Sequence, residues 1–352
     1  MAKKKVLTYR SLLVIGIAVS LAGIWGCVNK EKEYNGNELE LSTWITDWQW
    51  GSGLDDFKQL TQGLTSIQVF ATYFSSTDQL FYSTDNLEAI PEIMEVSAEN
   101  SVMNVDLTIV NDRFEENGTV TQKDALLLTR LMATPESRLA HIADIIETVS
   151  KFDFQGVEID YENINSEDWE SVCAFYEELY LSLEKMGKTL RIILEPRTPI
   201  EQLRLPEGPT YVMMAYNIYG MHSGPGPKAN ATFIKEVTQK MDNLPGESII
   251  AFATGGFDWA DTGEVGAVTE KEAVTRSKKS SNSPIRDEAS GSVYFEYLDE
   301  NNQRHIVWYA DDITLAKWIE IANQSGYFKI ALWRMGGFEK ETIEYINQLK
   351  RN

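Results

Sequence analysis

Three acidic residues alternate with apolar ones in the segment 154–162, which reads Phe-Gln-Gly-Val-Glu-Ile-Asp-Tyr-Glu. On a β-strand, alternate side chains point to opposite faces, so Glu158, Asp160 and Glu162 share one face. Acidic residues are depleted in strands, and the opposite face here is wholly apolar or aromatic. This pattern favours a functional column of carboxylates. The alternative is a solvated edge strand in an acidic protein.

Such a column could carry out acid–base chemistry. Carboxylates that are crowded together and removed from water bind protons more tightly, because burial and neighbouring negative charge both disfavour the ionised form. At least one of the three is therefore expected to hold its proton near neutral pH, which suits a general acid.

The segments around this strand alternate between strand-like and helix-like patterns. Short apolar runs that predict strands occur at 41–45, 66–72, 105–110, 156–161, 190–194, 211–216, 249–253 and 329–333. Helical spacing occurs between most of them, as at 135–150, 166–186, 231–241 and 313–323. Eight strands alternating with helices predict an α/β fold of the (β/α)8 or TIM-barrel type, with its active site at the C-terminal ends of the strands. The polar stretch 260–305 is predicted to be a small insertion after strand seven.

The composition excludes some functions. The chain has 352 residues, and its 53 acids against 32 bases give a net charge of −21. Such a charge repels phosphate and argues against a nucleic-acid partner. The 3 histidines and 2 cysteines lack the spacing of a zinc site. We therefore expect no metal and no cofactor, and we expect a monomer.

The first residues are expected to lie outside the fold. In the segment 1–26, basic residues precede an uncharged run at 11–25, as in a signal peptide. The end of this segment resembles a bacterial lipobox, which predicts lipidation of Cys27, with 27–38 as a tether and 39–352 as the catalytic domain. The protein is then an extracytoplasmic, membrane-anchored lipoprotein at the bacterial cell surface. The alternative is an uncleaved N-terminal anchor.

The segment 155–162 resembles the DxxDxDxE signature of glycoside hydrolase family 18, the family of chitinases and N-acetylglucosaminidases. Further family motifs follow in the same order along the chain. The sequence Met-Ala-Tyr-Asn at 214–217 resembles the MxYD motif, Gly-Gly-Phe-Asp-Trp at 255–259 resembles the YGxxW stretch, and Ala-Leu-Trp-Arg at 331–334 resembles the strand-eight segment. The segments 222–227 and 307–312 are most similar to the bacterial branch that includes spore-cortex and cell-wall glucosaminidases.

The resemblance implies a substrate-assisted retaining mechanism, in which the 2-acetamido group of the substrate is the nucleophile. Glu162 would be the general acid and base, Asp160 would orient the acetamide, and Tyr216 would donate a hydrogen bond to it. Glu158 would adjust the proton affinity of Asp160 from deeper in the barrel. The substrate would be a β-linked glycan that contains GlcNAc, such as peptidoglycan, chitin-type oligomers or the core of N-glycans.

Three positions depart from the family pattern. Gln155 replaces the first Asp of the signature, Glu158 replaces the middle one, and Asn217 replaces the Asp that follows the tyrosine. The first position is structural in the family, so we expect Gln155 to be tolerated. Glu158 keeps its charge, and Asn217 keeps hydrogen bonding. None of the three removes the acid, the acetamide-orienting residue or the tyrosine.

Aromatic residues complete the expected sugar cleft, because aromatic faces stack on pyranose rings. The family places Trp333 under the reactive sugar, and Asn217 lies beside it in the expected site. Trp44 and Trp48 lie at the end of the first strand and at the mouth of the barrel, although for Trp48 packing at the rim is an equal alternative. Asn111, at the end of the third strand, is a further candidate for the cleft.

Two other functions remain open. One is a non-catalytic glycan-binding barrel of the same fold. Inactive members of the family usually lack the last Glu of the signature, and Glu162 is present here. The other is a barrel hydrolase with a protein nucleophile, which needs a second carboxylate about 5 Å from Glu162.

Overall fold

The computed structural model describes residues 39–60, 64–99 and 104–349. The predicted signal peptide, the lipidation site Cys27 and the tether lie outside these residues. Within the described part of the chain, no helix is both long enough and apolar enough to cross a membrane.

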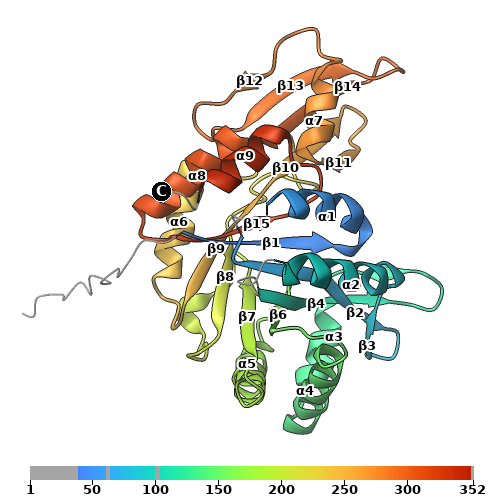
Figure 1. Ribbon diagram of the computed structural model, residues 1–352, viewed down its shortest axis with the longest axis vertical. Coiled ribbons are helices and arrows are strands. Elements are labelled where there is room, and N and C mark those ends of the chain that lie inside the picture. The colour runs from blue at the N-terminus through green and yellow to red at the C-terminus, as the bar shows by residue number, and fades with distance from the viewer. Residues whose placement is uncertain (1–38, 61–63, 100–103, 350–352) are drawn as a thin grey trace, which may run out of the picture. The chain divides into compact units, whose positions relative to one another are not determined.

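Eight parallel strands close into a barrel, which confirms the predicted fold (Figure 1). They are β1 (Glu40–Thr46), β2 (Ser66–Ser75), β4 (Asn104–Phe114), β6 (Gly156–Asp160), β7 (Thr189–Leu194), β8 (Thr210–Met214), β9 (Ser248–Ala253) and β15 (Lys329–Trp333). Around the ring each strand pairs with the next in this order, and β15 pairs with β1. The two short strands β3 (Leu80–Tyr82) and β5 (Val120–Thr121) extend β2 and β4 in antiparallel fashion.

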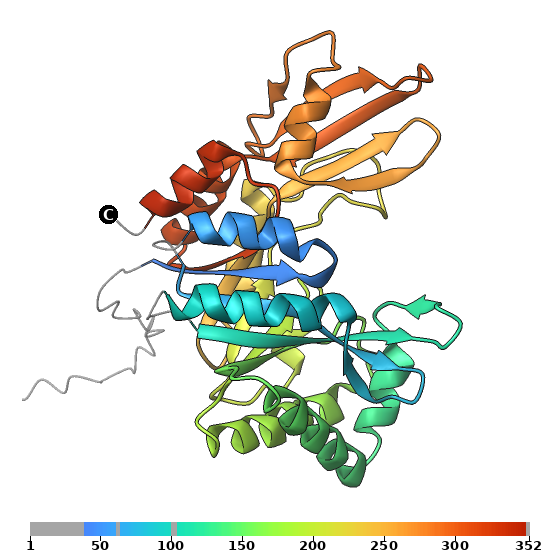
Figure 2. The same ribbon diagram turned by 45° about the vertical axis from the view of Figure 1, so that its right-hand side comes forward.

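Helices connect most of the barrel strands. They are α1 (Trp50–Gln59), α2 (Thr84–Ala98), α3 (Ala125–Met132), α4 (Pro135–Val149), α5 (Trp169–Glu184), α6 (Ala231–Met241), α8 (Asp312–Gln324) and α9 (Lys340–Gln348), with the short 3-10 helices η1 (Asp47–Gln49) and η2 (Ile200–Gln202). In Figure 2, the blue α1 and the teal α2 run alongside the strands of the N-terminal part of the barrel. These helices cover the apolar outer face of the sheet.

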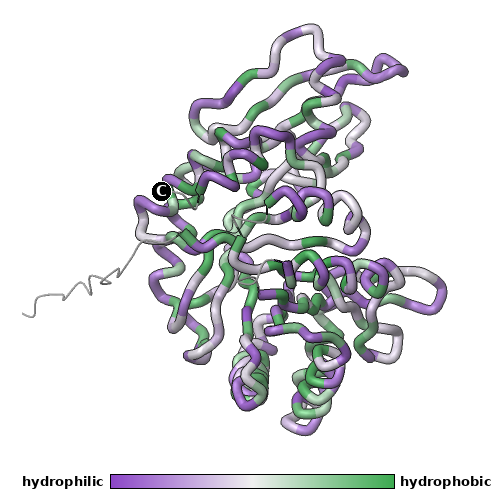
Figure 3. Tube along the Cα trace, viewed as in Figure 1, coloured by the Kyte–Doolittle hydropathy of each residue, from purple (hydrophilic) through white to green (hydrophobic). Residues whose placement is uncertain are grey.

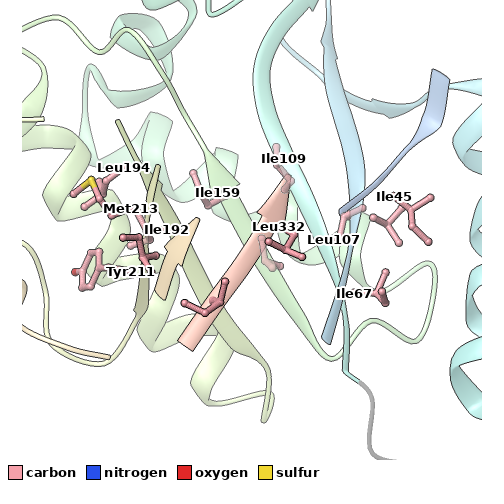
Figure 4. Packing of buried hydrophobic residues seen from close by; sticks show 14 of the residues in the cluster. Ile45, Ile67, Leu107, Ile109, Ile159, Ile192, Leu194, Tyr211, Met213 and Leu332 are labelled. Carbon is pink, nitrogen blue, oxygen red and sulfur yellow. The ribbon is translucent and has the colours of Figure 1, made fainter. Parts of the chain in front are cut away.

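The main core lies between the strands and these helices. Leu107, Ile109, Ile159 and Ile192 point to this side and have no exposed surface (Figure 4). Figure 3 shows hydrophobic residues recurring along the barrel strands, whereas the helices alternate between hydrophobic and hydrophilic residues. The apolar face of each strand thus fixes its orientation, and the alternate residues must point into the barrel.

The predicted insertion after the seventh barrel strand is present as an antiparallel sheet. It consists of β10 (Gly255–Ala260), β11 (Val265–Val268), β12 (Ile285–Arg286), β13 (Val293–Leu298), β14 (Arg304–Ala310) and the helix α7 (Glu270–Ser277). Its strands span 255–310, a few residues more at each end than the expected 260–305. It has its own apolar cluster, which includes Phe295, Val307 and Tyr309. In Figure 1, α7 and β12 to β14 lie together at the top of the view.

Candidate active site

Strand β6 and the two residues after it carry the column of carboxylates. Val157 and Ile159 point to the outer core, so Glu158 and Asp160 point into the barrel. Glu158 has no exposed surface, Asp160 is half-buried, and the side chain of Glu162 at the barrel mouth is 16% exposed. The alternation read from the sequence therefore gives a column that becomes more accessible towards the mouth.

Three donors hold Glu158 at the base of this column. The parallel register places Thr108 of β4 and Arg191 of β7 on either side of Glu158. Thr108 Oγ1 donates to Glu158 Oε1 at 2.8 Å, and Arg191 Nε donates to Oε2 at 2.8 Å. Trp44 Nε1 donates to Oε1 at 2.5 Å. Glu158 is thus a buried carboxylate with a cationic partner.

Asp160 lies directly above Glu158 and has few partners. Its Oδ1 atom is buried and accepts no hydrogen bond from any residue that the structure describes. Burial raises the pKa of Asp160 well above the usual aspartate value, and the negative charges of Glu162 and Glu158 raise it further. Asp160 therefore retains a proton more readily than an ordinary aspartate, and its Oδ1 is free to bind a substrate group.

Lys123, which the sequence reasoning missed, contacts the carboxylate at the mouth. Its Nζ lies 2.6 Å from Glu162 Oε2. Burial raises the pKa of Glu162, the Lys123 ammonium opposes that rise, and Glu195 adds to it. The net direction is upward, as a general acid requires. Lys123 follows β5, and its backbone N–H donates to Asp112 Oδ1 at 2.8 Å.

Asn111 holds the backbone that presents Glu162. Asn111 Nδ2 donates to the carbonyl of Glu162 at 3.0 Å, and the N–H of Glu162 donates to Asn111 Oδ1 at 3.0 Å. The exposed fraction of Asn111 is only 1%. The structure therefore places Asn111 beneath Glu162 instead of on the cleft wall that the sequence suggested. It is a positioning residue.

Tyr216 and Asn217 follow β8 at the same end of the barrel. Tyr216 is half-buried and packs with Trp333 against the inward-facing cluster of the barrel. Burial raises the pKa of Tyr216, and the charge of Asp160 adds to the rise, so the phenol keeps its proton and can donate it in a hydrogen bond. Asn217 is exposed and has a φ of 62°, a left-handed conformation that Asn tolerates well.

The aromatic residues form a connected group beside the carboxylates. The ring centroid of Trp333 lies 5.7 Å from that of Trp44 and 4.8 Å from that of Phe70, in edge-on contacts. Trp44 is 2% exposed, so it supports Trp333 and Glu158 from below and offers no face to a sugar. Trp48 is 54% exposed and contacts Phe70 edge-on at 5.6 Å. Trp333 and Trp48 are therefore the accessible members of the predicted set.

Two cavities border residues that follow the barrel strands, one beside β15 and the other beside β6, β7 and α5. A cavity of about 440 Å³, which we call the Trp333 cavity, is lined by Trp333, Trp48 and Asn217 together with residues of the insertion. A second cavity of about 820 Å³ borders Asn163 and Glu195, next to Glu162. In the ring of eight strands, β15 and β1 lie opposite β6 and β7. The two cavities thus border opposite sides of the ring, and neither is lined by Asp160 or Glu162.

Comparisons with known proteins identify the family of the chain and its fold. The model of the family described as glycosyl hydrolases family 18 matches residues 41–337. The glycosylase YvbX of Bacillus subtilis, itself described as uncharacterized, is 22% identical over 62% of this chain and 68% of its own length. The cortical fragment-lytic enzyme of Bacillus anthracis is 26% identical over 70% of this chain. This chain spans only 57% of the length of that enzyme.

Solved structures share the fold. The spore cortex-lytic enzyme SleL of Bacillus cereus superposes with a TM-score of 0.73 at 20% identity, over 88% of this chain and 73% of its own. A chitinase from Chromobacterium violaceum superposes with a TM-score of 0.75 at 14% identity, over 89% of this chain and 99% of its own.

The contribution of the buried ion pair between Glu158 and Arg191 can be tested by the stability of a variant protein. In Glu158→Gln the charge of Arg191 is left buried without its carboxylate, which typically costs about 3–5 kcal/mol. We expect a clear decrease in the free energy of unfolding, measured by urea denaturation. A matched control is Glu296→Gln, because Glu296 also pairs with an arginine, Arg304, but both side chains are more than half exposed. Equal effects of the two substitutions would contradict this account of the column.

Proposed function

The chain belongs to the glycosyl hydrolases of family 18, and from this premise we propose that it cleaves β-linked glycans at GlcNAc by a substrate-assisted retaining mechanism. The observation that carries the proposal is the column on β6. Asp160 lies between a pinned carboxylate and the partly exposed Glu162, and its buried Oδ1 lacks a partner among the described residues. An acetamide N–H would donate to that acceptor.

The proposed reaction has two steps. In the first, the acetamide carbonyl oxygen of the substrate attacks the anomeric carbon while Glu162 donates its proton to the glycosidic oxygen, and the leaving sugar departs. The product is an oxazolinium ion, whose N–H is held by Asp160 and whose oxygen accepts a hydrogen bond from Tyr216. In the second, Glu162 removes a proton from water, and the hydroxide attacks the same carbon and restores the acetamide. Each step inverts the configuration of the anomeric carbon, so the product retains the configuration of the substrate.

The surroundings of Glu162 support its role as acid. A group that donates a proton near neutral pH needs a raised pKa, and burial raises the pKa of Glu162 in spite of the nearby Lys123. Asn111 fixes the backbone of Glu162 from below, which limits the positions of its carboxyl group.

The two cavities favour a polymeric substrate. A glycan whose reactive sugar stacks on Trp333 would extend into the Trp333 cavity in one direction and towards the cavity beside Glu195 in the other. Several relatives are named cortical fragment-lytic enzymes, and cell-wall glycan is accordingly the substrate that we propose among the GlcNAc-containing candidates.

The nucleophile can be tested with two matched oligosaccharides. We expect an oligosaccharide with GlcNAc at the cleaved position to be hydrolysed, and the same compound with glucose there to be inert, because glucose carries no acetamide. Glu162→Gln should lower hydrolysis of the GlcNAc compound by about 10²–10⁴-fold while binding persists. Products are measured by mass spectrometry. Equal turnover of the two sugars would indicate a protein nucleophile and overturn the mechanism.

The contact between Lys123 and Glu162 can be tested by its effect on the pH profile. Lys123 opposes the raised pKa of Glu162, so Lys123→Met should raise that pKa further. Glu162 must be protonated to act as acid, and the alkaline limb of kcat/KM should therefore move to higher pH. Lys340→Met removes an exposed lysine paired with Glu344 and should leave the profile unchanged. A limb that is unmoved or moves to lower pH would refute the assignment.

We further propose that the enzyme is held at the bacterial surface by a lipid on Cys27. The support is the sequence pattern alone, a basic segment followed by an uncharged run that ends at this cysteine. Cys27→Ala should block processing or release the protein from membranes, as measured by fractionation and immunoblotting. The control is Cys173→Ala, since Cys173 is buried in α5. A Cys27→Ala variant that remains membrane-bound at the mature size would exclude the lipid anchor.

A further inference from the structure

The Trp333 cavity contains two basic side chains that the mechanism does not use. Lys228 and Arg334 line it together with Trp333 and Asn217. Arg334 directly follows Trp333, and Lys228 precedes α6. Arg334 ends the motif-like segment 331–334, but the sequence assigned it no role and offered no motif for Lys228, because the two are brought together only when the ends of β8, β9 and β15 meet.

Neither cation has a carboxylate partner within 4.0 Å in the part of the chain that the structure describes. Lys228 Nζ donates to the carbonyl of Thr254 at 2.7 Å and lies 5.1 Å from the ring centroid of Phe257. The Arg334 guanidinium donates to the carbonyl of Met335 at 3.2 Å and lies 5.5 Å from the ring of Trp48. A lysine has three donors and an arginine five, so most donors of both remain available.

The positions of these cations carry an energetic cost. Buried charges are usually paired, and here two like charges share one cavity. The effect is visible in Lys228, because burial and the charge of Arg334 lower its pKa to about 7. An arriving anion would offset the repulsion between the two groups and favour the protonated form of Lys228. Two basic side chains share this cavity although the net charge of the chain is −21.

Two acids also line the cavity, but each is engaged elsewhere. Glu270 accepts hydrogen bonds from the N–H of Glu339 at 3.0 Å and from Thr342 Oγ1 at 2.8 Å, at the start of α9. Glu272 accepts from the N–H of Thr269 at 2.7 Å in the capping box of α7. Both therefore serve helix N-termini, and although the charge of Glu272 also acts on Arg334, no hydrogen bond or ion pair within 4.0 Å joins the two among the described residues.

We propose that the Trp333 cavity binds a carboxylate carried by the sugar next to the reactive GlcNAc, so that the preferred substrate is an acidic amino-sugar glycan and not a neutral chitin-type chain. The inference rests on the proposed function, because it takes the GlcNAc that is cleaved to lie on Trp333. A lactyl ether carboxylate, as on the muramic acid of peptidoglycan, and the terminal carboxylate of an attached peptide present the same chemistry to Lys228 and Arg334.

The test compares glycans that differ only in this charge. Peptide-free oligosaccharides of alternating GlcNAc and muramic acid are assayed beside the same compounds with their carboxylates converted to methylamides, the peptide-bearing compounds, and a chitin oligosaccharide of equal length. We expect kcat/KM to be about 10-fold or more higher for the glycan with free carboxylates than for its methylamide, because a hydrogen bond to a charged group stabilises the complex by this amount. A higher kcat/KM for the peptide-bearing glycan than for the peptide-free glycan would identify the peptide carboxylate as the bound group. A lower kcat/KM for the peptide-bearing glycan would identify the lactyl carboxylate.

Substitutions then connect the advantage to the cavity. Lys228→Met and Arg334→Met should each reduce the ratio of kcat/KM between the carboxylate and methylamide glycans towards one. Lys235→Met, on the exposed side of α6, should leave the ratio as in the wild type. The wild-type comparison stands on its own if either cavity variant fails to fold.

The outcomes separate this inference from the proposed function. Equal kcat/KM of the wild type for the carboxylate and methylamide glycans, with both hydrolysed, would overturn the anionic site and leave the glycosidase intact. Hydrolysis of none of the glycans would overturn the proposed function and the inference with it. A wild-type preference that persists unchanged in both cavity variants would show that another part of the protein recognises the charge.

Discussion

The site depends on the carboxylate of Glu158 being held in place inside the barrel. Trp44, Thr108 and Arg191 all donate to it, and they come from three different strands. This pinned group places negative charge beneath Asp160, whose pKa is raised mainly by burial and further by its two acidic neighbours. The same hydrogen bond from Trp44 orients the ring that supports Trp333. Acid–base chemistry and the sugar platform therefore share one anchor.

Much of this could be predicted from the sequence, because it follows from local periodicity. Alternation along 154–162 was enough to place Glu158, Asp160 and Glu162 on one face, and the apolar runs were enough to predict the barrel. The roles of Asn111 and Trp44 could not be read in this way. Both lie at or next to the ends of strands predicted from the sequence, where a residue of the cleft was expected. Only the packed structure shows that both side chains are buried beneath the cleft. Arg191 left a signal, since it interrupts an apolar strand, but its partner lies 33 residues away.

The residues from loops were the hardest to predict. Lys123 reaches Glu162 from 39 residues away, and Lys228 and Arg334 line the same cavity although they lie far apart in the sequence. No spacing rule connects such positions, because the closure of the barrel brings them together. The insertion contributes in the same way, since its first strand and α7 complete one wall of the Trp333 cavity. The barrel thus supplies the reacting groups, and the loops and the insertion shape what surrounds them.

The central claim, that Asp160 retains a proton in its buried position in the column, can be measured by NMR titration of the protein labelled with carboxyl-¹³C aspartate. The resonance of Asp160 is identified by its absence in Asp160→Asn. The account predicts that this carboxyl group titrates well above the ordinary aspartate pKa of about 3.9, in steps coupled to Glu162. A resonance that titrates at or below the ordinary value would contradict it.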